Sequence, residues 1–150
     1  MANTYVQLAE HVVFSTKNRD KVISSLIRER VEKYISGIIS KLNQKVLAIY
    51  CMPDHCHILI GRTSENSIAN LVREIKTRSS KFINAEHLVK GKFKWQSGYG
   101  AFSVSSHSQD RVIDYIRNQP LRHKKSSFEE EYLDILRAAK VDFDPKYVFD

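Results

Sequence analysis

Cysteine, glycine and proline are scarce in this sequence of 150 residues, which contains two, five and three of them. With so few glycines and prolines, the chain lacks the composition of a flexible linker. Cys51 and Cys56 are too few for a disulfide framework and lie in apolar, strand-like sequence, so we expect buried thiols in a reducing compartment. No apolar run approaches the roughly 20 residues that a membrane span needs, and no signal peptide is evident. These absences exclude secreted, membrane and fibrous classes and favour a cytoplasmic protein with no membrane partner.

The composition is that of a globular protein with an excess of positive charge. Hydrophobic residues make up 42% and charged residues 27% of the chain. Lysine and arginine number 24 against 17 acidic residues, which gives a formal charge of +7. This excess favours an anionic partner, and nucleic acid is favoured over a membrane because no amphipathic basic anchor is present. The length predicts one domain over residues 1–150, with an extended tail from about residue 140.

The hydrophobic pattern predicts four strands and four helices. Alternating or continuous apolar sequence predicts strands over residues 5–14, 45–52, 55–60 and 101–105. Apolar residues at three- and four-residue steps predict helices over residues 24–42, about 67–82, 108–119 and 128–139. The Pro53-Asp54 turn signal joins the second and third strands in a hairpin. This order of elements predicts an α+β fold of ferredoxin-like type, in which helices cover an antiparallel sheet.

His55 and His57 are the first candidate site. Alternate side chains of a strand share one face, so both imidazoles point the same way while Cys56 points into the core. Two imidazoles on one face can reach a common metal ion. The alternative is a partly exposed histidine pair with no ligand, and the spacing alone does not decide between the two.

Tyr115 and Gln119 are the second candidate site. Four residues apart on a helix, they are neighbours on one face, and Gln119 also falls close to the apolar Val112 and Ile116. A buried amide without a partner costs roughly 1–3 kcal/mol, so Gln119 needs one, and a metal ion held by the two histidines would serve. The alternatives are a glutamine that bonds the last carbonyls of its helix before Pro120, and a tyrosine that only packs.

Four segments of the chain together resemble one known family. They are residues 5–19, the Met-Pro-Asp-His-Cys-His sequence at 52–57, residues 95–105, and the Tyr-Ile-Arg-Asn-Gln sequence at 115–119. The combination is similar to the HUH-type single-tyrosine transposases of the smallest bacterial insertion sequences, which include the REP-associated tyrosine transposases. The resemblance covers nearly the whole chain. Cys56 departs from the pattern, because a bulkier aliphatic residue is commoner there, but it is a small buried hydrophobe.

The resemblance implies an RRM-like HUH endonuclease fold and a DNA-cutting enzyme. Tyr115 would attack the scissile phosphate of single-stranded DNA and leave a 5′-phosphotyrosine and a free 3′-OH. His55, His57 and Gln119 would hold Mg²⁺ or Mn²⁺ beside that phosphate. The resemblance also implies a homodimer that acts on DNA with hairpin ends. No nucleotide cofactor is needed, because the covalent link conserves the phosphodiester energy.

Basic side chains on the second helix and in the loop after the first strand are candidates for phosphate contacts. Those that we predict to bind DNA are Lys17, Arg19, Arg73, Lys76, Arg78 and Lys81. Each of them could instead be a solvated surface charge. Two other functions share these features. One is a nucleic-acid-binding module without catalysis, and the other is a metal-dependent phosphodiesterase in which water replaces Tyr115 as the nucleophile.

Overall fold

A four-stranded antiparallel sheet forms the centre of the computed structural model, which describes residues 2–150. Its strands, in the spatial order β2-β3-β1-β4, are β2 (Lys45–Cys51), β3 (His55–Arg62), β1 (Leu8–Ser15) and β4 (Gly100–Ser103). β2 and β3 form the predicted hairpin across Pro53-Asp54. The α+β, ferredoxin-like prediction is therefore confirmed.

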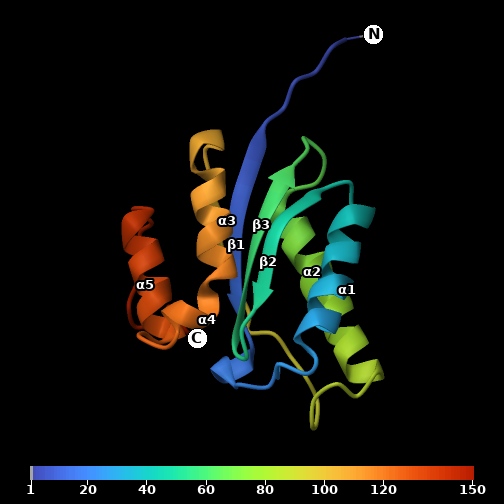
Figure 1. The fold of residues 1–150 in the computed structure, drawn as a ribbon, viewed down its shortest axis with the longest axis vertical. Coiled ribbons are helices and arrows are strands. Elements are labelled where there is room, and N and C mark those ends of the chain that lie inside the picture. Colours follow the sequence, from blue (N-terminus) through green and yellow to red (C-terminus); the bar gives the residue numbers. More distant parts are fainter. Residues whose placement is uncertain (1) are drawn as a thin grey trace.

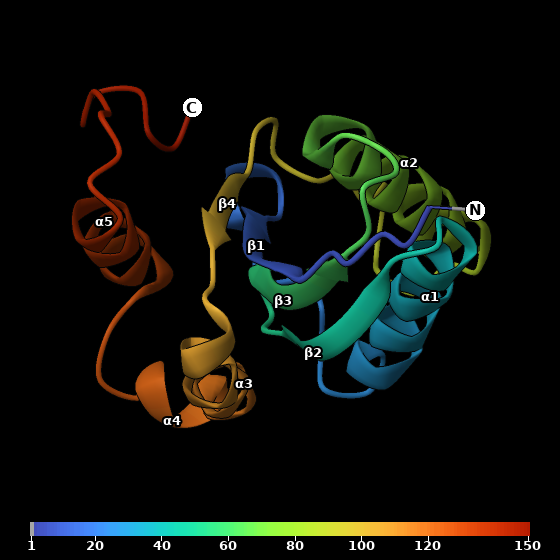
Figure 2. The same cartoon turned by 90° about the horizontal axis from the view of Figure 1, so that it is seen from above.

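Helices cover both faces of the sheet (Figures 1 and 2). One face carries α1 (Arg28–Lys41) and α2 (Ile68–Ala85), and the other carries α3 (Gln109–Arg117), α4 (Gln119–Arg122) and α5 (Phe128–Ala138). Short 3-10 turns, η1 (Lys17–Arg19) and η2 (Ser106–Ser108), follow β1 and precede α3. Within residues 2–150, no helix has the length and apolar character to cross a membrane.

Side-chain alternation divides the sheet into two unequal cores. The larger core lies between the sheet and α1 and α2, and it takes residues such as Val12, Phe14, Ile58 and Ile60, all at most 2% exposed. The smaller apolar cluster contains Ala9, Ala48, Leu59 and Ile116 and lies under α3. His11, next to Val12 on β1, and His57, next to Ile58 on β3, point to the opposite face and lie against Tyr115 of α3.

Local side-chain contacts cap two of the helices, and the prediction of two buried thiols is confirmed. The Ser67 and Ser127 hydroxyls cap α2 and α5 by accepting from the backbone N–H of Asn70 and Glu130. Cys51 and Cys56 are buried free thiols. Trp95, which interleaves with lysines in the sequence, is only 5% exposed, and its indole N–H donates to Ser79 Oγ.

The element ends differ from the prediction at two places that matter. β1 begins at Leu8 rather than at residue 5, because Leu8 pairs with Arg62 at the end of β3 and earlier residues have no partner strand. The helix predicted over residues 108–119 ends at Arg117, and α4 starts at Gln119 with Pro120 in its first turn. Proline lacks an N–H, which makes it a poor continuation of α3 but a good start for a new helix.

Candidate active site

Both histidines of β3 direct Nε2 to the same place under α4 and α5. The side chains are almost fully buried, at 1% exposure for His55 and 0% for His57. Nδ1 of His55 donates to Asp54 Oδ1 at 2.6 Å, since a carboxylate can only accept. Nδ1 of His57 lies 2.8 Å from Nε2 of His11 on the neighbouring strand β1. Outer hydrogen bonds of this kind fix the ring orientations of metal-binding histidines.

The buried carboxylate of Glu131 on α5 lies at the centre of the site. Its Oε1 is 3.0 Å from His57 Nε2 and 3.5 Å from His55 Nε2. Its Oε2 accepts from Gln119 Nε2 at 2.8 Å and from the Tyr115 hydroxyl. One carboxylate thus joins both histidines, the amide and the phenol that the sequence singled out.

Gln119 is fully buried and makes its bonds to side chains of the site. Its Oε1 lies 3.1 Å from His55 Nε2 and 2.9 Å from Nε2 of His123, which stands four residues later. The break between α3 and α4 leaves Tyr115 and Gln119 on the same side, as the sequence predicted. The four predicted side chains, His55, His57, Tyr115 and Gln119, meet within one chain.

Helix α5 is held on the sheet by aromatic contacts. The Phe128 ring stacks on His55 with centroids 4.3 Å apart. Tyr132, one turn later, lies so close to Gly100 on β4 that a Cβ there would be 2.8 Å from the Tyr132 hydroxyl. The same Cβ would also be 2.8 Å from the Phe102 ring, so glycine at position 100 leaves room for the ends of these two aromatic side chains.

The charges in the site are strongly coupled. Burial alone would raise the pKa of Glu131, but the hydrogen bonds from His55 and His57 hold it well below its usual range. Burial opposes a charge on His55, but the bonds to Asp54 and Glu131 outweigh it and raise the pKa of His55 to about 9. Burial lowers the pKa of His57, and it lowers that of His11 to about 3. Glu131 is therefore an anion beside one imidazole that favours its charged form.

Tyr115 is half-buried on α3 and is a neutral phenol in this environment. Burial and the hydrogen bond to the Glu131 carboxylate raise the pKa of Tyr115 above its ordinary value near 10. The Arg122 guanidinium lies over the Tyr115 ring, 5.4 Å from its centroid, and acts in the opposite direction. Ionisation of this phenol needs a proton acceptor or an added positive charge.

The side chains of the site fit a divalent metal ion. One donor atom each from His55, His57, His123 and Glu131 lies within 4.8 Å of the others, and the Gln119 amide oxygen is beside them. Imidazole nitrogens and carboxylate or amide oxygens are metal ligands, and two of the imidazoles already have their outer nitrogens held by Asp54 and His11.

Two grooves reach the cluster from the surface. A cavity of about 690 Å³ is lined by Tyr115 together with the basic side chains Arg122, Lys124 and Lys125. A second cavity, of about 430 Å³, reaches Asp54 and His123 and is lined by Arg19 and Lys21 among others. An extended anionic ligand can therefore approach the site along the first cavity, whose charged lining residues are all basic, whereas the second cavity is also lined by Asp54 and Glu129.

The cations predicted to bind DNA are spread over both faces. Lys17 is exposed, whereas Arg19 donates to the backbone carbonyl of Phe149 at 2.9 Å. The other four lie on α2, across the sheet from Tyr115, and are not brought to the site. Of these, Arg73, Arg78 and Lys81 are exposed.

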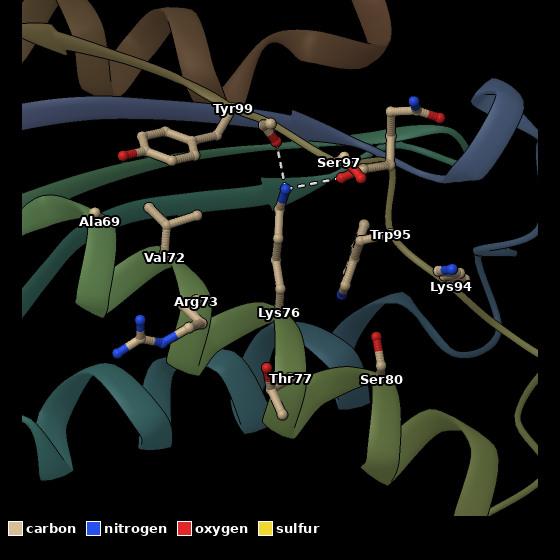
Figure 3. A pocket seen from close by; sticks show the side chains of 12 residues that line it. Ala69, Val72, Arg73, Lys76, Thr77, Ser80, Lys94, Trp95, Ser97 and Tyr99 are labelled. Atoms are coloured by element: carbon tan, nitrogen blue, oxygen red, sulfur yellow. Dashed lines mark hydrogen bonds between the residues drawn. The ribbon is translucent and has the colours of Figure 1, made fainter. Parts of the chain in front are cut away.

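Lys76 is partly buried, which does not fit the alternative of a solvated surface charge. It reaches from α2 into a cavity of about 440 Å³ (Figure 3) and donates to the carbonyls of Gln96, at 2.8 Å, and Gly98. Burial lowers the pKa of Lys76 to about 8. Its contact with DNA phosphates stays a prediction.

Sequence reasoning missed Glu131, and it missed the positions of His11, Asp54 and His123 around the histidine pair. His123 follows Gln119 by four residues, the spacing of a shared helix face, so this signal was present. Glu131 is the third of three consecutive glutamates, and nothing local separates it from its two neighbours. Only the packing of α5 against the sheet places Glu131, rather than either neighbouring glutamate, in the site.

Comparison with known proteins gives the family of this chain. Residues 4–119 match the family described as "Transposase IS200 like". The chain belongs to the IS200-like transposase family. The ISDra2 transposase TnpA of Deinococcus radiodurans is 25% identical over 118 residues, which are 75% of this chain and 84% of that protein. The transposase of insertion sequence element IS200 from Salmonella typhimurium is 26% identical over 125 residues, 79% of this chain and 81% of that one.

Solved structures of transposases share the fold. A crystal structure described as a transposase from Deinococcus radiodurans superposes with a TM-score of 0.63 at 27% identity, covering 79% of this chain and 96% of that one. A REP-associated tyrosine transposase, solved bound to a REP hairpin, has a TM-score of 0.61 at 15% identity and coverages of 82% and 73%. The IS200-like family and the fold were thus both predicted correctly from the sequence.

Proposed function

We propose that this IS200-like transposase cuts and rejoins single-stranded DNA at hairpin-bearing ends, with Tyr115 as the nucleophile. The observation that carries the proposal is the Glu131 carboxylate, which binds both the Tyr115 hydroxyl and His57 Nε2. A nucleophile and a histidine cluster linked by one buried group are placed to act on the same phosphate.

The chemistry is a phosphoryl transfer to the phenol. The Tyr115 oxygen forms a bond to the scissile phosphorus as the bond from phosphorus to the 3′ oxygen breaks, which leaves a 5′-phosphotyrosine and a free 3′-OH. The phenol proton passes towards the carboxylate of Glu131, which already accepts its hydrogen bond, and the departing 3′ oxygen takes up one proton from solvent to become the 3′-OH. Reversal of the same steps with a different 3′-OH rejoins the strand without ATP.

The residues around the nucleophile bind and orient the reactants. Asp54 and His11 hold the two imidazoles of β3 in place. A Mg²⁺ or Mn²⁺ ion bound by His55, His57 and Gln119 would polarise the phosphoryl oxygen and stabilise the leaving oxygen.

The family resemblance supports the proposed DNA partner and the proposed assembly. The groove beside Tyr115 is lined by Arg122, Lys124 and Lys125, which would attract the phosphates of a single strand. A relative of the same fold was solved with a REP hairpin, which supports a hairpin as the element recognised here. A homodimer is part of the proposal because the family resemblance implies it, although every site residue described above comes from one chain.

A labelled single strand tests the proposal. It carries the hairpin and flanking sequence that adjoin this gene in its genome, and it is incubated with the protein and Mg²⁺ or Mn²⁺. We expect a protein–DNA adduct that resists denaturant, is absent in Tyr115→Phe and persists in Tyr147→Phe, whose tyrosine is exposed at 58%. Cleavage without an adduct would instead indicate a water-using phosphodiesterase, and binding without cleavage a non-catalytic module.

A further inference from the structure

The part of the chain beyond the family match supplies two polar side chains to the site. The match ends at residue 119, whereas His123 and Glu131 lie on the α4–α5 connection and on α5. Both point into the cluster, and Glu131 is fully buried there. We propose that His123 and Glu131 are metal ligands that this C-terminal segment adds to His55, His57 and Gln119, and that they make the site selective for a transition-metal dication, such as Mn²⁺ or Co²⁺, over Mg²⁺. The inference rests on the proposed function, since it deepens the metal site named there.

The distances suit ligands of one ion. His123 Nε2 lies 2.9 Å from Gln119 Oε1 and 3.0 Å from Glu131 Oε1. The four donor atoms of His55, His57, His123 and Glu131 are nowhere farther apart than 4.8 Å. An ion with ligands at about 2.1 Å places opposite ligands about 4.2 Å apart, so small side-chain shifts bring all of them into range.

Donor and acceptor accounting shows that the Oε1 side of Glu131 requires positive charge in addition to the Arg122 guanidinium, whose Nε lies 3.2 Å from Glu131 Oε2. Ser126 O, a carbonyl, lies 2.9 Å from His123 Nδ1, and Asp54 accepts from His55 Nδ1. Carbonyl and carboxylate oxygens only accept, so each of these Nδ1 atoms carries a hydrogen and the neutral ring has its lone pair on Nε2.

Those two Nε2 lone pairs face oxygens that are themselves acceptors. Gln119 Oε1 lies opposite both rings, and Glu131 Oε1 lies 3.0 Å from His123 Nε2 and 3.5 Å from His55 Nε2. Acceptors that face acceptors in a buried space are held together by a cation or by protons on the rings. A bound cation satisfies all of them at once.

The composition of the donor set decides which ion is preferred. His55, His57 and Gln119 alone offer two nitrogens and one oxygen, and the added segment supplies a third imidazole and an anionic oxygen. Mg²⁺ prefers oxygen ligands and retains several waters, whereas imidazole-rich sites suit later divalent metals. Oε2 of Glu131 meanwhile accepts from Tyr115, so the added ligand also fixes the nucleophile beside the ion.

Metal binding by the full-length protein tests the inference without using activity. The chain is freed of metal with a chelator that is then removed, and it is titrated with Mn²⁺, Co²⁺ or Mg²⁺ by calorimetry, with the visible absorption of bound Co²⁺ as a second reading. We expect Mn²⁺ and Co²⁺ to bind at least about tenfold more tightly than Mg²⁺. Glu131→Gln and His123→Ala should each weaken Mn²⁺ binding by at least the roughly 10- to 100-fold that loss of an outer-shell partner produces.

Control variants separate this inference from the proposed function. Glu130→Gln, on the same helix but exposed, should bind metal as the wild type does, since glutamine also serves at that capping position. His57→Ala should abolish binding. Normal Mn²⁺ binding by folded Glu131→Gln and His123→Ala proteins, with loss in His57→Ala, would overturn the inference and leave the proposed metal site intact. Normal binding in His57→Ala would refute the metal site itself. His123 is partly exposed in the segment between α4 and α5, so we expect His123→Ala to fold. This variant therefore tests the added metal ligands even if Glu131→Gln fails to fold.

Discussion

The two faces of the sheet use the same alternating strands for opposite purposes. Against α1 and α2, the side chains of β1 and β3 are apolar and make the large core. On the face towards α3, α4 and α5, the same strands carry the buried side chains of His11, His55 and His57. Gln119 on α4 contacts His55, and Glu131 on α5 contacts His57. These five polar residues are at most 7% exposed. One face therefore stabilises the fold by burying apolar surface. On the other face, each buried polar or charged group needs its own hydrogen-bond or charge partner.

Neighbouring substitutions on β3 provide the sharpest test of this division. Ile58→Ala removes a fully buried side chain from the apolar face and should lower the free energy of unfolding by about 2–5 kcal/mol. His57→Ala, one residue away on the other face, should lower adduct formation by roughly 100-fold or more because it removes a metal ligand. Urea unfolding and gel analysis of the adduct measure the two effects. The proposed division between the two faces would be wrong if the folded Ile58→Ala protein formed no adduct while the His57→Ala protein formed it normally.

Mixing two inactive variants tests whether the polar face is complete in one chain. Tyr115→Phe and His57→Ala each disable one half of the site, and in this structure both halves belong to the same subunit. We expect a mixture of the two proteins, refolded together so that subunits exchange, to form no adduct. Recovery towards a quarter or more of wild-type activity would show instead that α3 completes the partner's site.

The pH dependence of stability should also come from the polar face. The pKa of His55 is 6.5 in an unfolded chain and about 9 in the folded protein, so its contribution is fully present below pH 6.5 and is lost as the pH rises through 9. With a chelator present, the loss should be on the order of 3 kcal/mol in the free energy of unfolding between pH 6.5 and pH 9.5. His55→Gln should flatten this part of the urea-midpoint profile. An equal decline in that variant would assign the effect to other groups.

The smallest expected effect concerns the cations of the two faces. Lys124→Gln with Lys125→Gln, beside Tyr115, should weaken binding of a short unpaired strand and reduce the salt dependence by about one unit per cation. Arg78→Gln with Lys81→Gln, on α2, should leave that short strand bound within about twofold and weaken only a longer DNA that carries the hairpin. Fluorescence anisotropy over a salt series measures both. Equal losses on the short strand would place the cleaved DNA on α2 as well.

Much of the fold could be predicted because local patterns of apolar residues determine where its strands and helices form. Alternating or continuous apolar sequence located the four strands, and apolar residues at three- and four-residue steps located α1, α2, α3 and α5. The boundaries that moved depend on other parts of the chain: β1 is limited by where β3 ends, and the end of α3 by the start that Pro120 gives to α4. The first limit depends on a partner strand far along the chain, whereas the second is marked locally by Pro120.

The amino-acid sequence by itself determined the pairing of His55 with His57 on one face, the side shared by Tyr115 and Gln119, and the resemblance to the IS200-like transposases. Strand and helix periodicity are local properties, so residue spacing suffices for them. Only the tertiary structure decided that Glu131, and neither of the two glutamates before it, enters the site, and that His11 lies behind His57. Those contacts join residues 74 and 46 positions apart, and they exist because the sheet and α5 pack together, which no spacing along the chain encodes.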